Sequence, residues 1–415
     1  MNILNKMEKI TFVIPSRNNL EFLKLAYKSI RKLSLIETGG HSPPVGGIPH
    51  DILILNDAST DGTQEWIKSL NDPNLITYHN EGPDRIGIVG MFDKGIEMAR
   101  TDIIMAFHAD MVAAPNLDGH ILKHLKKGTV VSATRVEPPL HPDGPEKMLV
   151  DFGVEVEDFN INKFYNWVDT EYTPKHGQTT TEGIFAPWCM YKEDFLAVGG
   201  HDELFAPQSK EDSDLFNRFV LNGYNIVQTW EGLVYHFTSR GSRFNKHAGG
   251  AAGKNSDEWL HTTTKNMRNF IRKWGTPVKH DPLMKPIISP KYNIAFRVYN
   301  NNLNLLSALE PWCDILYGDG EWWFYKEYSL KEQPNTLINI ENKLKPLEFE
   351  LYEDFEGIVV IIDGNTFNQQ DFQIIQQLPE IIKDSGEIGE FKLGNLKINI
   401  NSLEEYQNKL ITCKK

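Results

Sequence analysis

The residues best suited to chemistry are His108, Ala109 and Asp110, which directly follow the apolar run 102–107. A strand that ends in an imidazole and a carboxylate places two potential metal ligands at the carboxyl edge of a sheet, where open α/β sheets bind their ligands. Asp110 suits a hard divalent cation such as Mg²⁺ or Mn²⁺, and His108 shifts the preference towards Mn²⁺. In isolation, Asp110 could equally cap a turn and His108 could be structural.

Two earlier segments end apolar runs with short polar side chains. Residues 15–18, Pro-Ser-Arg-Asn, either face a ligand at the sheet edge or form an ordinary turn with a helix cap. Residues 56–62, Asn-Asp-Ala-Ser-Thr-Asp-Gly, carry three short acceptors that can hydrogen-bond a ribose or the edge of uracil. Thr60 or Asp61 can also cap the next helix, but capping accounts for one of these residues and not for the cluster.

Two later segments carry charged residues that could act with the first three. Glu211 and Asp212 suit the N-terminus of a helix because of the macrodipole, and one carboxylate near an acceptor hydroxyl could also act as a general base. His236 ends an apolar run and could complete a metal site. Arg240 and Arg243 follow it and could neutralise a diphosphate.

The elements that must position these residues alternate between apolar strands and helical stretches in the first 110 residues. Continuous apolar strands alternating with helices predict a parallel sheet covered on both faces. Strands are expected at 10–15, 51–56, 75–78 and 103–107, and helices at 20–33, 63–70, 87–99, 192–198, 213–222 and 266–274. Short strand-like runs are expected between 129 and 167, a mobile loop at 239–254, and no regular structure at 37–50.

Four prolines between residues 277 and 290 indicate a linker at about 276–290. We therefore expect one domain over residues 1–285 and a smaller C-terminal α+β domain over 291–415. A strand at 358–362 and a helix near 372–383 are expected in the second domain, for which the residues indicate no role.

The composition narrows the class of protein. A net charge of −13 argues against non-specific binding to nucleic acid, which needs a surplus of Lys and Arg. Three scattered cysteines, an N-terminus without an apolar signal segment, and no apolar run near the roughly 20 residues that span a bilayer predict a cytoplasmic protein without a transmembrane segment, although peripheral membrane contact stays open.

Taken in order, the polar segments resemble those of glycosyltransferase family 2, the inverting nucleotide-sugar transferases with the GT-A fold, over about residues 9–275. The family's opening strand with Pro and a following Asn matches 13–18. Its Asp-Asp-x-Ser-x-Asp nucleotide motif matches 56–61, with Asn in the first place, and its Asp-x-Asp metal motif corresponds to 108–110.

The second half of the domain carries further matches to the same family. The Gly-Gly-Phe-Asp-Glu acceptor-side segment corresponds to 199–203, and the Glu-Asp base motif to Glu211 and Asp212. A late histidine ligand corresponds to His236, and the helix ending in Lys-Trp-Gly to 270–275. The resemblance implies an α/β fold of the GT-A type, with a mostly parallel sheet and helices on both faces.

The resemblance also implies a role for each position. Asp212, beside Glu211, takes the proton of an acceptor hydroxyl, and Asp110 binds the cation, with His236 as a second ligand and His108 as a third candidate. Arg240 and Arg243 stabilise the diphosphate, and Trp188 and Asp202 lie on the acceptor side, although Trp188 could equally be a core residue. The nucleotide-binding residues are Pro15, Ser16, Arg17, Asn18, Asp57, Ser59, Asp61, Arg85, His108 and Ala109.

The implied activity is inverting transfer of a hexosyl or N-acetylhexosaminyl group from a nucleotide sugar, most simply a UDP-sugar, to a hydroxyl of a glycan or glycoconjugate, with Mn²⁺ or Mg²⁺. Two departures stand out: His108 replaces an Asp, and Phe92-Asp93 replaces an Arg-Asn pair, which removes one expected polar contact.

Two rival functions stay open on the same fold. A catalytically silent sugar-nucleotide or glycan-binding protein would not need the base Asp212. A nucleotidyltransferase usually brings a Gly-rich loop after the first strand, and residues 16–20 contain no glycine.

Overall fold

The computed structural model describes residues 8–33, 35–36, 45–46, 49–347, 355–406 and 410. The chain forms two compact units, the first comprising residues up to 262 with 280–286, and the second comprising 263–279 with residues from 287 onwards. The domain limits expected near 285 and 291 stay a prediction. Most of the expected irregular segment 37–50, and Cys413, lie outside the described residues.

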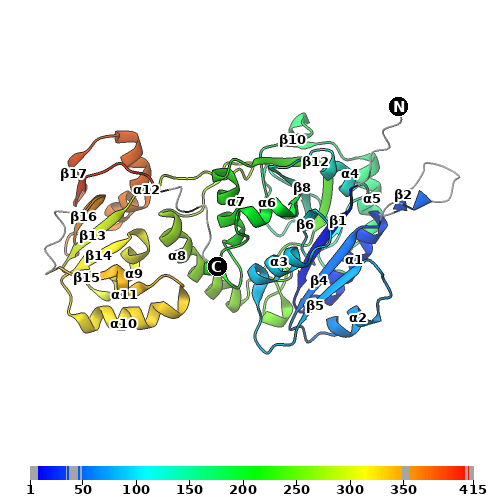
Figure 1. The fold of residues 1–415 in the computed structure, drawn as a ribbon, viewed down its shortest axis with the longest axis horizontal. Helices are drawn as coiled ribbons and strands as arrows, with labels where there is room; N and C mark the ends of the chain where they lie inside the picture. Colours follow the sequence, from blue (N-terminus) through cyan, green and yellow to red (C-terminus); the bar gives the residue numbers. More distant parts are fainter. Residues whose placement is uncertain are drawn as a thin grey trace. The chain divides into compact units, whose positions relative to one another are not determined.

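The first unit is built on a ten-stranded sheet (Figure 1). Eight of its strands follow the order β10-β12-β8-β11-β6-β1-β4-β5, and the other two are β7, which pairs with β12, and β9, which pairs with β8. Its strands are β1 (Ile10–Ser16), β4 (Asp51–Asp57), β5 (Leu75–Asn80), β6 (Ile103–Ala106), β7 (Met111–Ala113), β8 (Thr129–Glu137), β9 (Met148–Leu149), β10 (Thr180–Thr181), β11 (Trp188–Tyr191) and β12 (Asn225–His236). A separate pair joins β2 (Leu35–Ile36) and β3 (Val45–Gly46).

The predicted parallel core of this sheet is confirmed for β5, β4, β1 and β6, which pair in parallel. All seven residues of β4 are buried, as a continuous apolar strand between two helical layers requires. The antiparallel β11 joins β6 to β8, and β8 pairs in parallel with β12. Because β1, β4, β6, β8 and β12 run in one direction, their carboxyl ends meet at one edge of the sheet.

Helices cover the sheet, and their sequences explain how they pack. In α1, the residues Leu23, Ala26 and Ile30 recur on one face and are buried, which is the spacing of an amphipathic helix. The helices of the first unit are α1 (Leu20–Leu33), α2 (Thr63–Ser69), α3 (Gly87–Met98), α4 (Leu117–Leu122), α5 (Ile161–Thr170), α6 (Lys192–Ala197), α7 (Glu211–Leu221), the beginning of α8 (Asp257–Trp274), and the short 3₁₀ turns η1 (Lys175–Gly177), η2 (Glu203–Phe205) and η3 (Lys246–Ala248).

Two parts of the first unit differ from the sequence expectation. Helix α5 lies where short strand-like runs are expected; Asn160 caps it by accepting from the Lys163 amide, and Phe164 is its buried residue. Helix α8 begins nine residues before the expected 266, because the polar first half of this helix carries no apolar stripe to reveal it. None of the described helices is long and apolar enough to cross a membrane.

The second unit has its own six-stranded sheet with the order β15-β14-β13-β16-β18-β17 and its own apolar core. The first four strands are parallel, and β18 and β17 are antiparallel. Its strands are β13 (Ile294–Tyr299), β14 (Ile315–Gly318), β15 (Leu344–Pro346), β16 (Ile358–Asp363), β17 (Gly389–Leu393) and β18 (Leu396–Ile400). Its further helices are α9 (Leu303–Leu309), α10 (Trp322–Glu332), α11 (Ile340–Lys343) and α12 (Gln369–Ser385), with the 3₁₀ turns η4 (Glu310–Trp312) and η5 (Gln333–Asn335).

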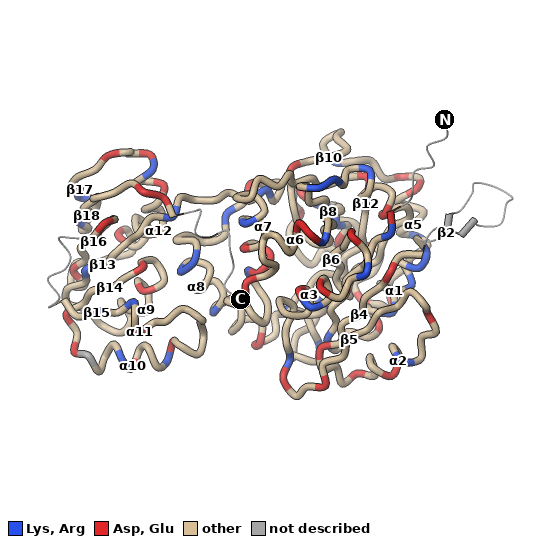
Figure 2. Tube along the Cα trace, in the orientation of Figure 1, with Lys and Arg blue, Asp and Glu red and all other residues tan. Residues whose placement is uncertain are grey.

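Charged residues of both signs are interspersed along the described chain of each unit (Figure 2). None of the described elements carries a long run of basic residues, which fits the net charge of −13. Cys189 and Cys313 are buried free thiols.

Candidate active site

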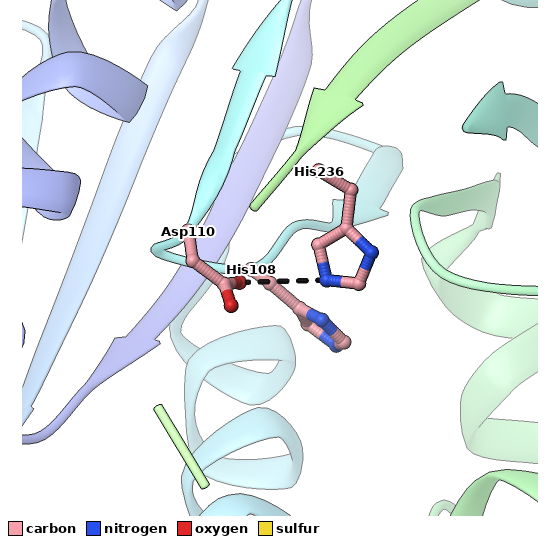
Figure 3. A group of neighbouring side chains, drawn as sticks. All are labelled: His108, Asp110 and His236. Atoms are coloured by element: carbon pink, nitrogen blue, oxygen red, sulfur yellow. Dashed lines mark ion pairs between the residues drawn. The ribbon is translucent and has the colours of Figure 1, made fainter. Parts of the chain in front are cut away.

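Three potential metal ligands converge at the carboxyl edge of the first sheet (Figure 3). His108 and Asp110 follow β6, and His236 ends β12. The antiparallel pairing of β7 with β12 places His236 opposite Met111, next to Asp110. One ligand atom from each of the three side chains lies within 4.8 Å of the other two. Two imidazoles and one carboxylate form a donor set that fits Mn²⁺ or a similar divalent cation.

Asp110 is held with one oxygen free to face the histidines. Its Oδ2 accepts a hydrogen bond of 2.6 Å from the backbone N–H of Arg240, and its Oδ1 lies 3.7 Å from Nε2 of His236. The free oxygen and the imidazole nitrogen therefore point towards a common space.

His108 is electrostatically suited to act as a neutral ligand. Burial lowers the pKa of its imidazole, and the negative charges of Asp110 and Asp212 oppose this shift without reversing it. A neutral imidazole keeps a nitrogen lone pair for a cation. The ring centroids of Phe92 and His108 are 6.1 Å apart. Phe92 thus places an apolar ring next to His108, where the family has a polar side chain.

Asp93, beside it, has a structural partner instead of a ligand. Its carboxylate accepts from the backbone N–H and from Nδ1 of His201, at 3.1 and 2.7 Å. The guanidinium of Arg218 donates to the carbonyls of Val198 and Gly200. Asp93 and Arg218 thus hold the segment 199–203 in place, a connection that the sequence analysis did not make.

The carboxylates expected at the nucleotide bind backbone groups of the protein. Asp57 accepts from the amides of Ile86 and Gly87 at the start of α3, and from Asn80. Asp61 accepts from the amide of Leu20, the first residue of α1, and from the amide and hydroxyl of Thr63, the first residue of α2, while its nucleotide role stays a prediction.

Other expected nucleotide residues join the first two loops of the sheet edge. The hydroxyl of Ser59 accepts from the amide of Asn18, whose side chain accepts in turn from the amide of Thr60. Ser16 is buried at the end of β1, where Pro15 pairs with Leu55 of β4. Ala109 is part of the hydrophobic core of the first unit.

Arg17 and Arg85 line a recess together with Asn18 and Gln208. Both guanidiniums face the carboxylate of Glu258 at the start of α8, at 3.7 Å for Arg17 and 2.6 Å for Arg85. Burial lowers the pKa of Arg85, and the charge of Glu258 opposes that shift. Sequence reasoning missed Glu258, whose only signal is an acidic residue in the first turn of a helix.

The expected catalytic carboxylates begin helix α7. Glu211 is buried, and its Oε2 has no hydrogen-bond partner among the described residues. Burial, and then the charge of Asp212, raise the pKa of Glu211 well above its usual value. Asp212 is only half-buried, and its charge acts on His108. Asp212 is therefore close enough to His108 for its charge to act there, and its charge also acts on its neighbour Glu211.

The two arginines expected at the diphosphate are placed differently. The guanidinium of Arg240 donates to Glu155 at 3.2 Å and to the carbonyl of Val154 at 2.5 Å, so only its backbone amide serves Asp110. The diphosphate role expected for its side chain stays a prediction. Arg243 donates to Asn255 at 3.1 Å, and its expected role stays a prediction.

Of the two acceptor-side residues, Trp188 is a core side chain. It is 1% exposed and packs against Phe195 and Phe219, with ring centroids 5.9 and 6.0 Å away. A buried ring has no face to offer a sugar, so the core alternative holds for Trp188. Asp202 caps η2 by accepting from the amide of Leu204 at 3.0 Å, and its acceptor role stays a prediction.

Residues 11–186 match the family model described as Glycosyl transferase family 2. With the mostly parallel sheet, the match confirms the predicted α/β fold of the GT-A type. The family region contains the segments 15–18, 56–61 and 108–110, whereas Asp212 and His236 lie beyond its end.

Solved structures that this chain matches include three of low sequence identity. GalNAc-T7 with UDP, GalNAc and Mn²⁺ is 12% identical with a TM-score of 0.43, over 65% of this chain and 49% of that one. A mannosyltransferase from Pyrobaculum calidifontis with GDP-Man and Mn²⁺ is 15% identical (TM-score 0.41; 68% and 69% of the two chains). TarS from S. aureus is 13% identical (TM-score 0.38; 56% and 61%).

The chain thus spans about half the length of the GalNAc-T7 chain that it matches. No curated protein sequence matches it.

Proposed function

We propose that this protein is an inverting, divalent-metal-dependent glycosyltransferase that moves a sugar from a nucleotide sugar to an acceptor hydroxyl. The observation that carries the proposal is the convergence of His108, Asp110 and His236 at the carboxyl edge of the sheet, where the charge of Asp212 acts on His108. The family match supports the reaction class. The donor is a UDP-sugar carrying a hexosyl or N-acetylhexosaminyl group, and the acceptor a glycan or glycoconjugate.

The three converging residues would hold Mn²⁺ or Mg²⁺, which supplies positive charge to the diphosphate leaving group. Arg17 and Arg85 bind the anionic nucleotide when its phosphate oxygens replace the carboxylate of Glu258 as their partner. The buried position of the site reduces the screening of these charges by water.

Asp212 is the base in this proposal. The acceptor oxygen forms a bond to the anomeric carbon, the bond from that carbon to the diphosphate oxygen breaks, and the acceptor proton passes to a carboxylate oxygen of Asp212. A single displacement inverts the configuration at the sugar. Burial and the charge of Asp212 raise the pKa of Glu211, which favours the protonated form of Glu211, whereas Asp212 is the half-exposed member of the pair that an acceptor can reach.

A donor screen tests the proposal. Panels of UDP-, GDP- and dTDP-sugars are incubated with the protein and Mn²⁺ or Mg²⁺, and sugar transfer or hydrolysis is scored by released nucleotide, with the anomeric configuration of the product read by NMR. We expect turnover with a UDP-sugar and an inverted product. Retention of configuration would contradict the single displacement.

The variant Asp212→Asn separates an enzyme from a binding protein on the same fold. We expect it to lower turnover by about 10²–10⁴-fold, the usual contribution of a general base, while nucleotide binding persists. Unchanged turnover in this variant would refute the assignment of the base.

A further inference from the structure

Glu137 lies behind the potential metal ligand His236, on the side away from Asp110. It ends β8 as His236 ends β12, and the two strands pair in parallel with Val136 opposite Tyr235. The next residue on each strand is therefore Glu137 and His236, and the alternation of side chains places both on the same face. Oε1 of Glu137 lies 3.0 Å from Nδ1 of His236, and Glu137 is 1% exposed.

The carboxylate of Glu137 is fixed by two buried cations. Nη1 of Arg135 donates to the same Oε1 at 2.9 Å, and Nζ of Lys147 donates to Oε2 at 2.8 Å. The guanidinium of Arg135 itself stacks on the ring of Phe185, 3.7 Å from its centroid. These contacts leave Glu137 no freedom to rotate away from the imidazole.

An ionised carboxylate accepts hydrogen bonds and donates none. The imidazole nitrogen that faces Glu137 must therefore carry its proton, which assigns the N–H to Nδ1. In the neutral ring, the lone pair then lies on Nε2, the atom that is 3.7 Å from Asp110. The opposite tautomer would direct a lone pair at the carboxylate and an N–H into the space between the three ligands.

We propose that Glu137 is a positioning residue that holds His236 in the tautomer and orientation needed to bind the cation. The inference rests on the proposed function, because it assigns Glu137 a role towards the metal of that same site. Carboxylates that accept from the second nitrogen of a ligand histidine typically change metal affinity by about 10–100-fold when removed.

The first test measures Mn²⁺ binding by the full-length chain, from the EPR signal of free Mn²⁺. Glu137→Gln should weaken binding by about 10–100-fold, since the amide is uncharged and can turn its NH₂ towards Nδ1. Glu146→Gln is the matched control, because Glu146 also faces Arg135, at 3.4 Å, and makes no contact with His236. We expect the control to bind Mn²⁺ within about twofold of the wild type, as it leaves the imidazole untouched.

Wild-type affinity in Glu137→Gln, or equal losses in both variants, would overturn the inference. Asp110→Asn separates this failure from failure of the proposed function. If Asp110→Asn weakens Mn²⁺ binding and Glu137→Gln does not, only the role of Glu137 falls. If Asp110→Asn has no effect, the metal site and the inference fall together.

A second measurement needs no change at Glu137 and decides the case if that variant does not fold. In ¹⁵N NMR spectra of the metal-free wild-type protein, the signals of His236 are assigned by comparison with His236→Gln. We expect a protonated Nδ1 and an unprotonated Nε2. A proton on Nε2 with none on Nδ1 would overturn the inference.

Discussion

Each unit of the molecule buries a glutamate among cations, and the glutamate of the first unit also faces a histidine. In the first unit, Glu137 accepts from two fixed cations and from the ring of His236 at 3.0 Å. In the second unit, Glu310 accepts from Arg272 at 2.6 Å and from Lys343 at 2.6 Å. His236 faces Glu137 with Nδ1 and Asp110 with Nε2, so the first cluster has a nitrogen lone pair available for a metal. The charged side chains of Arg272 and Lys343 carry only hydrogen-bond donors and offer a metal no lone pair.

In both clusters, nearby cations lower the pKa of a buried carboxylate. Burial alone would raise the pKa of Glu310, but Lys343 and Arg272 lower it to about 2. Burial acts in the same sense on Glu137, and Arg135, His236 and Lys147 hold its pKa well below the usual range. Both carboxylates stay charged at neutral pH, yet only the first is connected to the sheet edge where Asp110 lies.

The largest effect on stability is expected in the second cluster. Glu310→Gln leaves Lys343 buried without its counter-charge and Arg272 with one carboxylate in place of two, which should lower the free energy of unfolding by about 3–5 kcal/mol. Unfolding in urea measures the loss. Glu332→Gln removes a more exposed partner of Arg272 and should cost about 1 kcal/mol or less. The comparison breaks if Glu310→Gln changes Mn²⁺ affinity as Glu137→Gln is expected to do.

A smaller effect, on binding instead of folding, is expected at the sheet edge. Asp110→Asn removes the anionic ligand of the three and should weaken Mn²⁺ binding by at least about 10-fold, equivalent to about 1.4 kcal/mol. Isothermal titration with UDP, with and without EDTA, extends the test, since the metal should carry part of the nucleotide affinity. Equal UDP affinity in EDTA and in Mn²⁺ would contradict a metal at Asp110.

The smallest effect concerns the carboxylate pair of α7 and has a defined pH dependence. The folded-state pKa of Glu211 is raised, so the folded protein binds this proton more tightly than the unfolded chain does. The stability from this group is fully present below the unfolded-state pKa, about 4.3, and is lost as pH rises towards the folded-state pKa.

Glu211→Gln, which cannot ionise, should therefore stabilise the fold more at pH 8 than at pH 4. Thermal unfolding at the two pH values measures the difference. A gain that is equal at both pH values would show that the charge is not its cause.

Local patterns in the sequence were sufficient for much of the first sheet. The apolar strands at 10–15, 51–56 and 103–107 and the amphipathic helix at 20–33 predict elements that the structure contains, with the helix at the same limits. Their periodicity reflects burial on two faces or on one, which neighbouring residues alone reveal. The same patterns place polar residues after strands, so His108 and Asp110 could be selected from the sequence.

Partnerships between distant residues could not be read in this way. Glu258 faces Arg17 and Arg85, and Glu137 faces His236, only because helices and strands far apart in the chain come together. Trp188 is equally plausible as a core or as a surface residue until the packing of β11 is known.

The sequence by itself determined which chemical groups the protein carries and at which strand ends they lie, because strand periodicity and residue type are local properties. The tertiary structure decided which groups meet. Pairing of β12 with β7 brings His236 to Asp110, and pairing of β12 with β8 places Glu137 behind His236. Register between strands is set by packing across the whole sheet, so it converts a histidine at the end of an apolar run into an oriented candidate ligand.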